Sequence, residues 1–126
     1  MIFGKKKIID LIIKYFNEKK ISYEKNLNII SFSASYNDFS IYPYIKINEE
    51  NQQVSFLVNI RKINQKENVF EKLNTFNIKS QYFRAILNED IIVLEYNTLV
   101  DSDNLNDILD QMIDSLSSLR VEIKEL

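Results

Sequence analysis

The chain of 126 residues contains no cysteine, no histidine and no tryptophan, and it has one glycine and one proline. Without cysteine there is no disulfide, no thiolate nucleophile and no cysteine-type zinc or iron–sulfur site. Without histidine the commonest general base and the commonest transition-metal ligand are missing. One glycine does not supply a phosphate-cradling loop, which needs several for close backbone approach. We therefore expect a protein that is not an enzyme, with no catalytic residue, cofactor or metal.

Length and charge limit the remaining classes. A chain of 126 residues fits one globular domain, so we expect a single domain over residues 1–126. Sixteen basic and eighteen acidic residues give a net charge of −2, which supplies no general field for nucleic acid. The charge is uneven, because residues 1–25 are basic and residues 101–126 are acidic. The lack of cysteine suits the cytoplasm.

The first apolar segment has helical spacing. It predicts an amphipathic helix from about Lys5 to Lys20, packed deeply or against a second apolar neighbour such as a partner subunit. A secretion signal is the main alternative, but Asp10 and Lys14 interrupt the apolar run and no small-residue cleavage site follows. The segment is too short for a membrane span, and binding to a membrane surface through its lysines is a further alternative. The apolar positions are Ile8, Ile9, Leu11, Ile12, Ile13, Tyr15 and Phe16.

Period-two alternation then predicts three antiparallel strands, at residues 30–35, 39–47 and 54–61. Pro43 cannot donate a ladder hydrogen bond, so the middle strand is expected at an edge or with a bulge. The middle strand alternates isoleucine with Tyr42 and Tyr44. If the isoleucines face the core, the tyrosines lie on the other face, where they suit an interface or a shallow groove. Ordinary half-covered strand tyrosines are the equal alternative.

The second half reads as a helix, two strands and a helix. The middle helix is expected from about Lys66 to Phe76, the strands at residues 81–87 and 91–97, and the last helix after a cap at Ser102 or Asp103. The apolar run of the final strand suits the middle of a sheet. The fold class is therefore α+β, an antiparallel five-stranded sheet with three helices in the order α-β-β-β-α-β-β-α. The last helix also carries an acidic stripe of Asp103, Asp107, Asp110 and Asp114, read as a solvated face or as a surface for a basic partner.

A local sequence pattern carries a family resemblance. It consists of Leu73-Asn74, Phe76-Asn77, Tyr82, Arg84-Ala85 and Val93-Leu94-Glu95-Tyr96. With the element order, this pattern resembles the YbjN family and the type III secretion chaperone-like fold. The resemblance implies an antiparallel sheet that carries its helices, and a dimeric binding or chaperone-like module. We expect the resemblance positions Asn74 and Asn77 to help end the middle helix, Asn77 by a left-handed conformation.

These observations favour a bacterial, cytoplasmic, non-enzymatic protein-binding module, chaperone-like or regulatory, that acts as a homodimer. Its partner would lie as an extended segment along a sheet edge or helix groove. The alternative is a small inhibitor or immunity-type protein that binds a basic target through the acidic last helix. Strand parity gives a candidate partner-binding surface on the face opposite the core, made of Tyr42, Tyr44, Leu57 and Tyr82.

Overall fold

A computed structural model describes residues 7–64 and 67–126 of the chain. Its helices are α1 (Ile8–Lys19), α2 (Phe70–Lys79), α3 (Leu105–Ser118) and α4 (Arg120–Glu125). Its strands are β1 (Tyr23–Asn26), β2 (Ile29–Phe32), β3 (Ala34–Tyr36), β4 (Phe39–Ile41), β5 (Tyr44–Asn48), β6 (Gln53–Lys62), β7 (Arg84–Asn88) and β8 (Ile91–Leu99). The α+β class with an antiparallel sheet is confirmed. The number of strands and helices in the described residues is higher than the sequence predicted.

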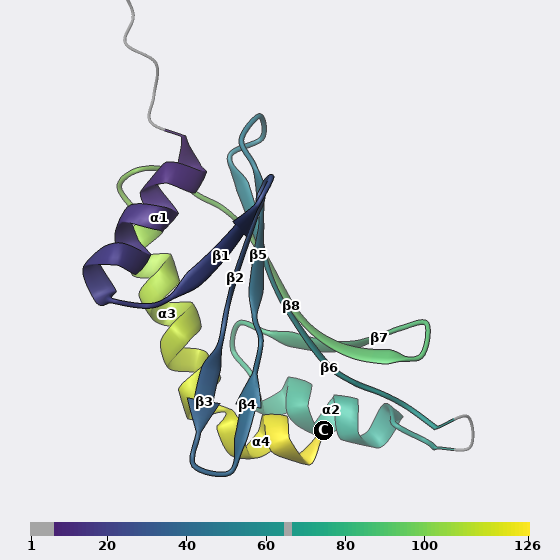
Figure 1. Cartoon of the computed structure of the whole chain (residues 1–126). Helices are drawn as coiled ribbons and strands as arrows, with labels where there is room; N and C mark the ends of the chain where they lie inside the picture. The colour runs from purple at the N-terminus through teal and green to yellow at the C-terminus, as the bar shows by residue number, and fades with distance from the viewer. Residues whose placement is uncertain (1–6, 65–66) are drawn as a thin grey trace, which may run out of the picture.

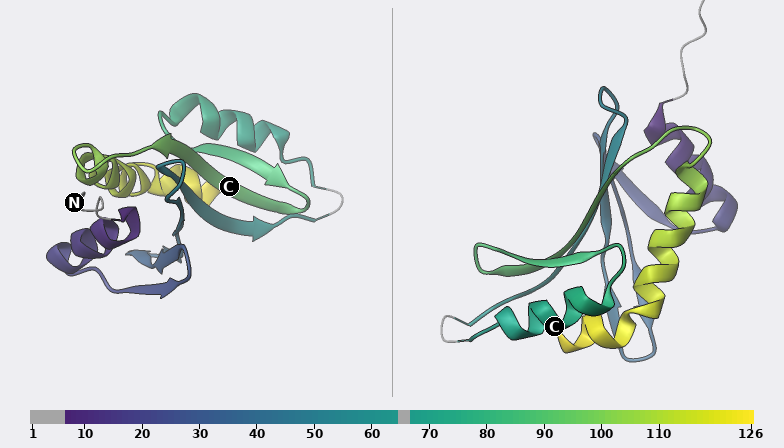
Figure 2. Two further views of the ribbon diagram at one scale, coloured as in Figure 1. Left: turned by 90° about the horizontal axis from the view of Figure 1, so that it is seen from above. Right: turned by 180° about the vertical axis from the view of Figure 1, so that it is seen from behind.

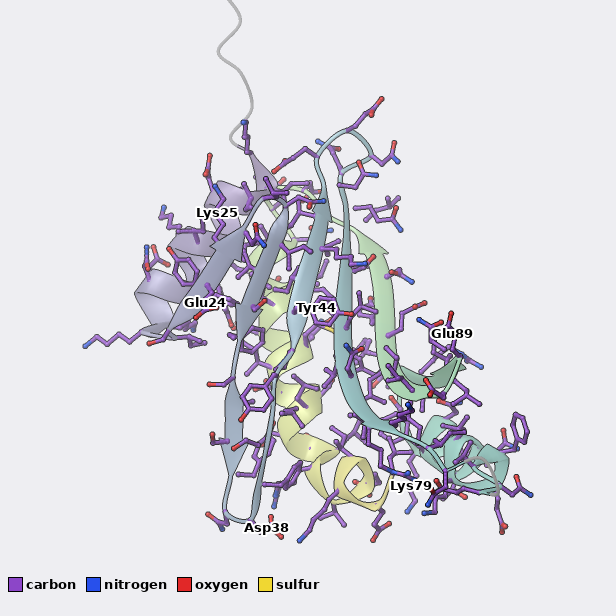
Figure 3. The ribbon with its side chains drawn as sticks, turned by 45° about the vertical axis from the view of Figure 1, so that its right-hand side comes forward. Glu24, Lys25, Asp38, Tyr44, Lys79 and Glu89 are labelled. Atoms are coloured by element: carbon purple, nitrogen blue, oxygen red, sulfur yellow. The ribbon has the colours of Figure 1, made fainter. Side chains whose placement is uncertain are left out.

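Six strands form one twisted antiparallel sheet in the order β1-β2-β5-β6-β8-β7 (Figure 1). Helices α1 and α3 lie side by side against one face of this sheet (Figures 1 and 2). Helices α2 and α4 pack against each other, and α2 also packs against β7. The core fills the space between sheet and helices, with Phe16 of α1, Ile45 of β5 and Met112 of α3 almost fully buried. The opposite face of the sheet carries no helix of the described chain (Figure 3).

Three local features account for the additional strands. The strand β1 was missed because its sequence, Tyr-Glu-Lys-Asn, has no alternation of apolar residues and is exposed at three of four positions. Two predicted strands bend at Ser33 and at the pair Tyr42-Pro43, so that β3 and β4 form a separate hairpin. Asp38 at the tip of this hairpin forms an ion pair with Lys124, which ties the hairpin to α4.

Pro43 acts as a break rather than as an edge residue. The strand β5 lies between β2 and β6, so the expectation of an edge strand is wrong. Pro43 has no N–H to donate, and the ladder stops between β4 and β5, while its carbonyl still accepts a hydrogen bond from the Phe32 N–H at 3.1 Å. The expected central position of the final strand is correct, because β8 lies between β6 and β7.

The helix boundaries also differ from the sequence prediction. The expected starts of the first and middle helices, Lys5 and Lys66, lie outside the described residues. The last helix is not capped by Ser102 or Asp103, because the residue preceding its first turn is Asn104. It also divides at Leu119 into α3 and α4. The predicted apolar face is nevertheless the buried one, with Leu105, Leu109, Met112 and Leu116 in the core.

Candidate functional site

The helix-free side of the sheet, here called the open face, is organised by the strand register. Tyr44 of β5 pairs with Leu57 of β6, and Leu57 pairs in turn with Glu95 of β8. Directly paired residues of antiparallel strands project from the same face, so these three side chains form a row across the sheet. The next pair along, Ile45 and Phe56, projects into the core. Tyr44 and Leu57 therefore project from the face opposite the core, and Figure 3 shows Tyr44 on that face.

A hollow of about 280 Å³ lies on the open face around this row. Leu57 and Val93 are 9% and 4% exposed although no described helix covers them, because neighbouring side chains on the twisted sheet surround them. Both lie outside the main core cluster, so they form a small apolar floor of their own. The lining residues are Tyr44, Lys46, Ser55, Leu57, Asn59, Ile86, Asn88, Val93, Glu95 and Asn97. An apolar floor with an amide and charged rim suits an amphipathic segment of another chain.

Tyr42 marks a second hollow, of about 410 Å³, at the edge strand β1. Its side chain is 70% exposed. Ser31 lines this hollow and is also the cross-strand partner of Tyr44, so the two hollows adjoin at that pair. The other lining residues are Ser22, Tyr23, Glu24, Phe32 and Ser33. Ser31 thus links the Tyr42 hollow to the Tyr44–Leu57 row, although the strand is interrupted between the two tyrosines.

Tyr82 does not join this surface. The strand β7 begins at Arg84, so the strand parity used to place Tyr82 does not extend to it. Its ring packs on Tyr96 with a centroid distance of 5.8 Å, and Tyr96 also stacks on Phe56 of the core side. Because Tyr82 is partly buried against the main core, its expected place beside Tyr42 and Tyr44 is wrong.

The two asparagines of α2 have roles other than the expected one. The helix continues to Lys79, so neither Asn74 nor Asn77 ends it, and neither has a left-handed backbone. Leu73 is buried in the core. Asn77 instead binds the edge strand: its Nδ2 donates to the Ala85 carbonyl at 3.1 Å, and its Oδ1 accepts from the Ala85 N–H at 2.7 Å. Local sequence gave no signal for this pairing.

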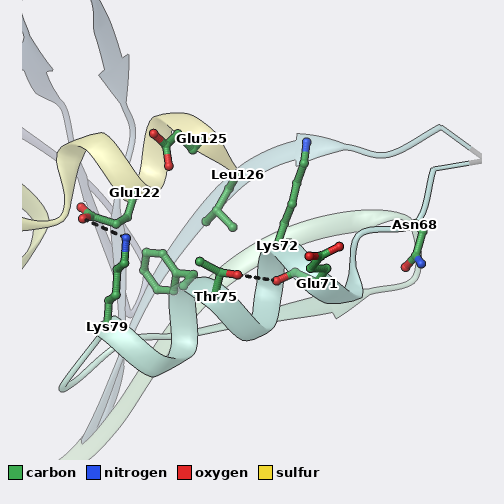
Figure 4. Close-up of a pocket in the computed structure, with 9 residues that line it drawn as sticks. Asn68, Glu71, Lys72, Thr75, Lys79, Glu122, Glu125 and Leu126 are labelled. Atoms are coloured by element: carbon green, nitrogen blue, oxygen red, sulfur yellow. Dashed lines mark hydrogen bonds and ion pairs between the residues drawn. The ribbon is translucent and has the colours of Figure 1, made fainter.

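A further hollow, of about 440 Å³, lies between α2 and α4 (Figure 4). Its floor includes Phe76 and its walls carry both signs of charge, with the Lys79 and Glu122 side chains 4.0 Å apart. Thr75 turns its hydroxyl onto its own helix, where it donates to the Glu71 carbonyl at 2.9 Å. The lining residues are Asn68, Glu71, Lys72, Thr75, Phe76, Lys79, Glu122, Glu125 and Leu126. The sequence does not predict this hollow, because the periodicity of residues 120–125 only extends that of the preceding helix and does not indicate a separate α4.

Comparison with known proteins places the chain in a family. The model described as "Nucleotidyl transferase of unknown function (DUF2204)" matches residues 19–126. The chain belongs to this family. A search of curated protein sequences found no match.

Two solved structures share the fold of this family member. YbjN, a proposed transcription regulator from E. coli, is 13% identical with a TM-score of 0.65, over 93% of this chain and 89% of that one. The Yersinia pestis type III secretion chaperone SycH, solved in complex with a stable fragment of YscM2, is 14% identical with a TM-score of 0.50, over 87% and 97% of the two chains. The expected resemblance to the YbjN and secretion-chaperone fold is therefore confirmed.

The acidic stripe of this family member is only partly solvated. Asp110 accepts a hydrogen bond from the Tyr15 hydroxyl at 2.5 Å and lies 3.9 Å from the Lys19 ammonium, so it joins α1 to α3. Burial of the Tyr15 ring, with Asp110 beside it, raises the pKa of the Tyr15 hydroxyl. The outer members Asp103, Asp107 and Asp114 are exposed. Asp110 therefore serves the packing of two helices, which reduces the surface available to a basic target.

Two features bear on metals and membranes. Over residues 7–64 and 67–126, no three side chains of the histidine, cysteine, aspartate and glutamate types converge on a common point suited to a metal ion. The Glu49 carboxylate accepts hydrogen bonds from the Ile8 and Ile9 N–H groups of α1, and the adjacent Glu50 is exposed. No helix in the described part of the chain has the length and apolar character needed to cross a bilayer.

Proposed function

We propose that this chain is a non-enzymatic protein-binding module, chaperone-like or regulatory, which acts in the cytoplasm as a homodimer. Its partner lies as an extended segment across the open face, from the Tyr42 hollow to the Tyr44–Leu57 row. The observation that carries the proposal is the hollow of the open face, which has Tyr44 at its lining, Leu57 and Val93 at its floor and no described helix over it. Tyrosine suits such a surface, because it brings a large apolar ring and a hydroxyl that stays hydrated.

The structural neighbours support this proposal. SycH, which has a similar fold, was solved in complex with a fragment of another protein, and YbjN is described as a proposed transcription regulator. Both activities need a surface for a partner and no catalytic centre. The exposed edge strand β1 borders the Tyr42 hollow, so its free backbone groups are within reach of the end of a segment that leaves the open face there.

The test replaces Tyr42 or Tyr44 with a photo-crosslinking amino acid, and the crosslinking is done in the cells that produce this protein. We expect both positions to crosslink the same protein, and the change Tyr44→Lys to abolish the crosslink from position 42. Asn106, an exposed residue of α3, is the matched control position and should give no such product. Equal crosslinking from Asn106, or different proteins from positions 42 and 44, would contradict a common site on the open face.

The family description supports a second candidate, nucleotidyl transfer. Such a reaction transfers a nucleoside monophosphate group from a nucleoside triphosphate to an acceptor and releases pyrophosphate. Positioned metal ions and cationic groups usually stabilise the phosphates. The test incubates the chain with α-labelled nucleoside triphosphates, magnesium and a cell extract as the acceptor source. Label transfer that disappears without the chain would establish this candidate, while its absence with all four nucleotides would leave the binding module as the function.

A further inference from the structure

One line of side chains on the open face, here called the cross-sheet row, contains a residue from each strand of the six-stranded sheet. Each member is the direct cross-strand partner of the next, so all of them project from the same face. Neighbouring strands lie about 4.8 Å apart, so the row spans about 24 Å from the first strand to the last. From β1 to β7 its members are Glu24, Ser31, Tyr44, Leu57, Glu95 and Arg84.

The cross-sheet row joins the two hollows of the open face. Its first two members line the Tyr42 hollow, and its next three line the hollow that has Leu57 and Val93 at its floor. Glu24 near one end of the row and Tyr44 near its middle are labelled in Figure 3. A segment that follows the row therefore contacts both hollows while it stays on one face of the sheet.

The two ends of the cross-sheet row carry opposite charges. Glu24 is exposed on β1, and Arg84 is exposed on β7. Over residues 7–64 and 67–126, neither side chain takes part in an ion pair. The carboxylate of Glu95, the strand partner of Arg84, instead accepts a hydrogen bond from the Asn97 amide at 2.9 Å. Both end charges are therefore available to a ligand.

We infer that the ligand of the cross-sheet row is an extended protein segment with a basic side chain at the Glu24 end, an acidic side chain at the Arg84 end and an apolar side chain between them. The inference rests on the binding module of the proposed function and specifies the chemistry of its partner. An extended chain advances about 3.3 Å per residue, so the basic and acidic residues lie about seven positions apart. The apolar residue lies about four positions from the basic one, over Tyr44 and Leu57.

The chemistry of each position supports this pattern. The Arg84 guanidinium is suited to a carboxylate, which it binds through two parallel hydrogen bonds, and the Glu24 carboxylate is suited to a cation. Tyr44 and Leu57 in the middle provide apolar area for the central side chain. Exposed charges contribute little affinity, but opposite charges at the two ends disfavour a segment of uniform charge. The end charges therefore determine which segment binds more than how tightly it binds.

Three fluorescently labelled peptides with uncharged termini test the pattern. The matched peptide is Lys-Ser-Thr-Ser-Leu-Ser-Thr-Glu, and the other two carry lysine at both ends or glutamate at both ends. By fluorescence anisotropy at low salt, we expect the wild type to bind the matched peptide about fivefold more tightly than either of the others. Arg84→Glu should instead prefer the peptide with two lysines, and Glu24→Lys the peptide with two glutamates.

The control for these exchanges is Lys25→Glu, a change of charge next to Glu24 on the same strand. Lys25 is exposed, and its strand partner Ile30 is buried in the core, so Lys25 does not project from the open face. This variant should keep the wild-type preference. Because Arg84→Glu sets two acids side by side, Glu24→Lys provides an independent test, and circular dichroism checks that the variants remain folded.

The outcomes separate this inference from the proposed function. Equal affinity for all three peptides, lost in Tyr44→Lys, would overturn the charge pattern and leave the open face as a binding surface. The same preference in the wild type, Arg84→Glu and Glu24→Lys would also overturn it. Binding of none of the three peptides would overturn the inference as well, whereas the crosslinks from positions 42 and 44 decide the proposed function independently.

Discussion

The side-chain amide of Asn77 binds both backbone polar groups of Ala85, at 3.1 Å to the carbonyl and 2.7 Å from the N–H. Ala85 belongs to β7, an edge strand of the sheet, so this amide occupies a position that a seventh strand would take. An edge strand with free backbone groups is a template for unwanted pairing. Asn77 therefore closes part of one sheet edge, and the exposed strand β1 lies at the other.

Replacing Asn77 with Ala should lower the free energy of unfolding by about 2 kcal/mol, because two partly buried backbone groups of Ala85 lose their partner. The measurement is urea unfolding followed by circular dichroism. Asn106→Ala is the matched control: it makes the same change on an exposed helix position and should shift stability by less than about 0.5 kcal/mol. Equal effects of the two changes would show that the paired hydrogen bonds contribute nothing.

Glu49 provides a second long-range contact, because its carboxylate accepts hydrogen bonds from the Ile8 and Ile9 N–H groups at 2.7 and 3.0 Å. The turn between β5 and β6 thus caps the N-terminus of α1, where the helix dipole favours negative charge. Glu49→Ala should cost about 1 kcal/mol. It should also speed hydrogen exchange at Ile8 and Ile9. The adjacent exposed Glu50→Ala should change neither quantity, and a similar loss in both variants would refute the capping role.

Periodicity predicted those parts of the fold whose cause is local. The apolar positions of α3, such as Leu105 and Met112, are buried as expected, because a helix packed on a core must repeat apolar residues every three to four positions. Parity placed Tyr44 and Leu57 on the open face for the same reason, since side chains alternate within a regular strand. It failed for Tyr82 because no strand is present there.

The contacts that the sequence does not predict join residues of different helices and strands, and the periodicity within one element carries no signal for them. The capping of Ile8 by Glu49 spans 41 residues, and no local pattern reports such a pair. Asn77 was expected to end a helix, because asparagine tolerates the left-handed conformation, but its amide instead reaches Ala85. The two hollows of the open face depend on the register and twist of several strands, which the sequence of one strand does not determine.

Lys20 adopts the left-handed conformation, with φ of 59°, at the C-terminus of α1. The following Ile21 N–H bonds back to the Phe16 carbonyl at 2.9 Å, the arrangement in which glycine is usual. Lys20→Gly should raise the free energy of unfolding by about 0.5 to 1 kcal/mol, since relief of the left-handed strain exceeds the added freedom of the unfolded chain. Lys14→Gly, within the same helix, should lower it by about 1 kcal/mol. Thermal unfolding of both variants measures the opposite signs, and a loss in Lys20→Gly would contradict the prediction.

The last prediction concerns Arg61 and Glu67, whose guanidinium and carboxylate form two hydrogen bonds of 2.9 and 2.5 Å. The hydrogen bond to Arg61 lowers the pKa of the Glu67 carboxyl from 4.5 to about 2. Arg61 also donates from Nε to the Leu126 carbonyl at 2.7 Å. The pair therefore connects β6 to the segment before α2 and to the residue after α4.

Because the folded-state pKa is depressed, the ionised Glu67 stabilises the fold above pH 4.5, and this contribution declines as the pH falls from 4.5 to about 2. Glu67→Gln should thus be less stable than the wild type at pH 7, and the difference should shrink steadily over that window. Urea unfolding of both proteins between pH 2 and 7 measures it, and taking the difference cancels the other carboxylates. Glu50→Gln, at an exposed turn, is the control and should show no such dependence. A difference between wild type and Glu67→Gln that stays constant down to pH 2 would mean that Glu67 acts through its shape and not its charge.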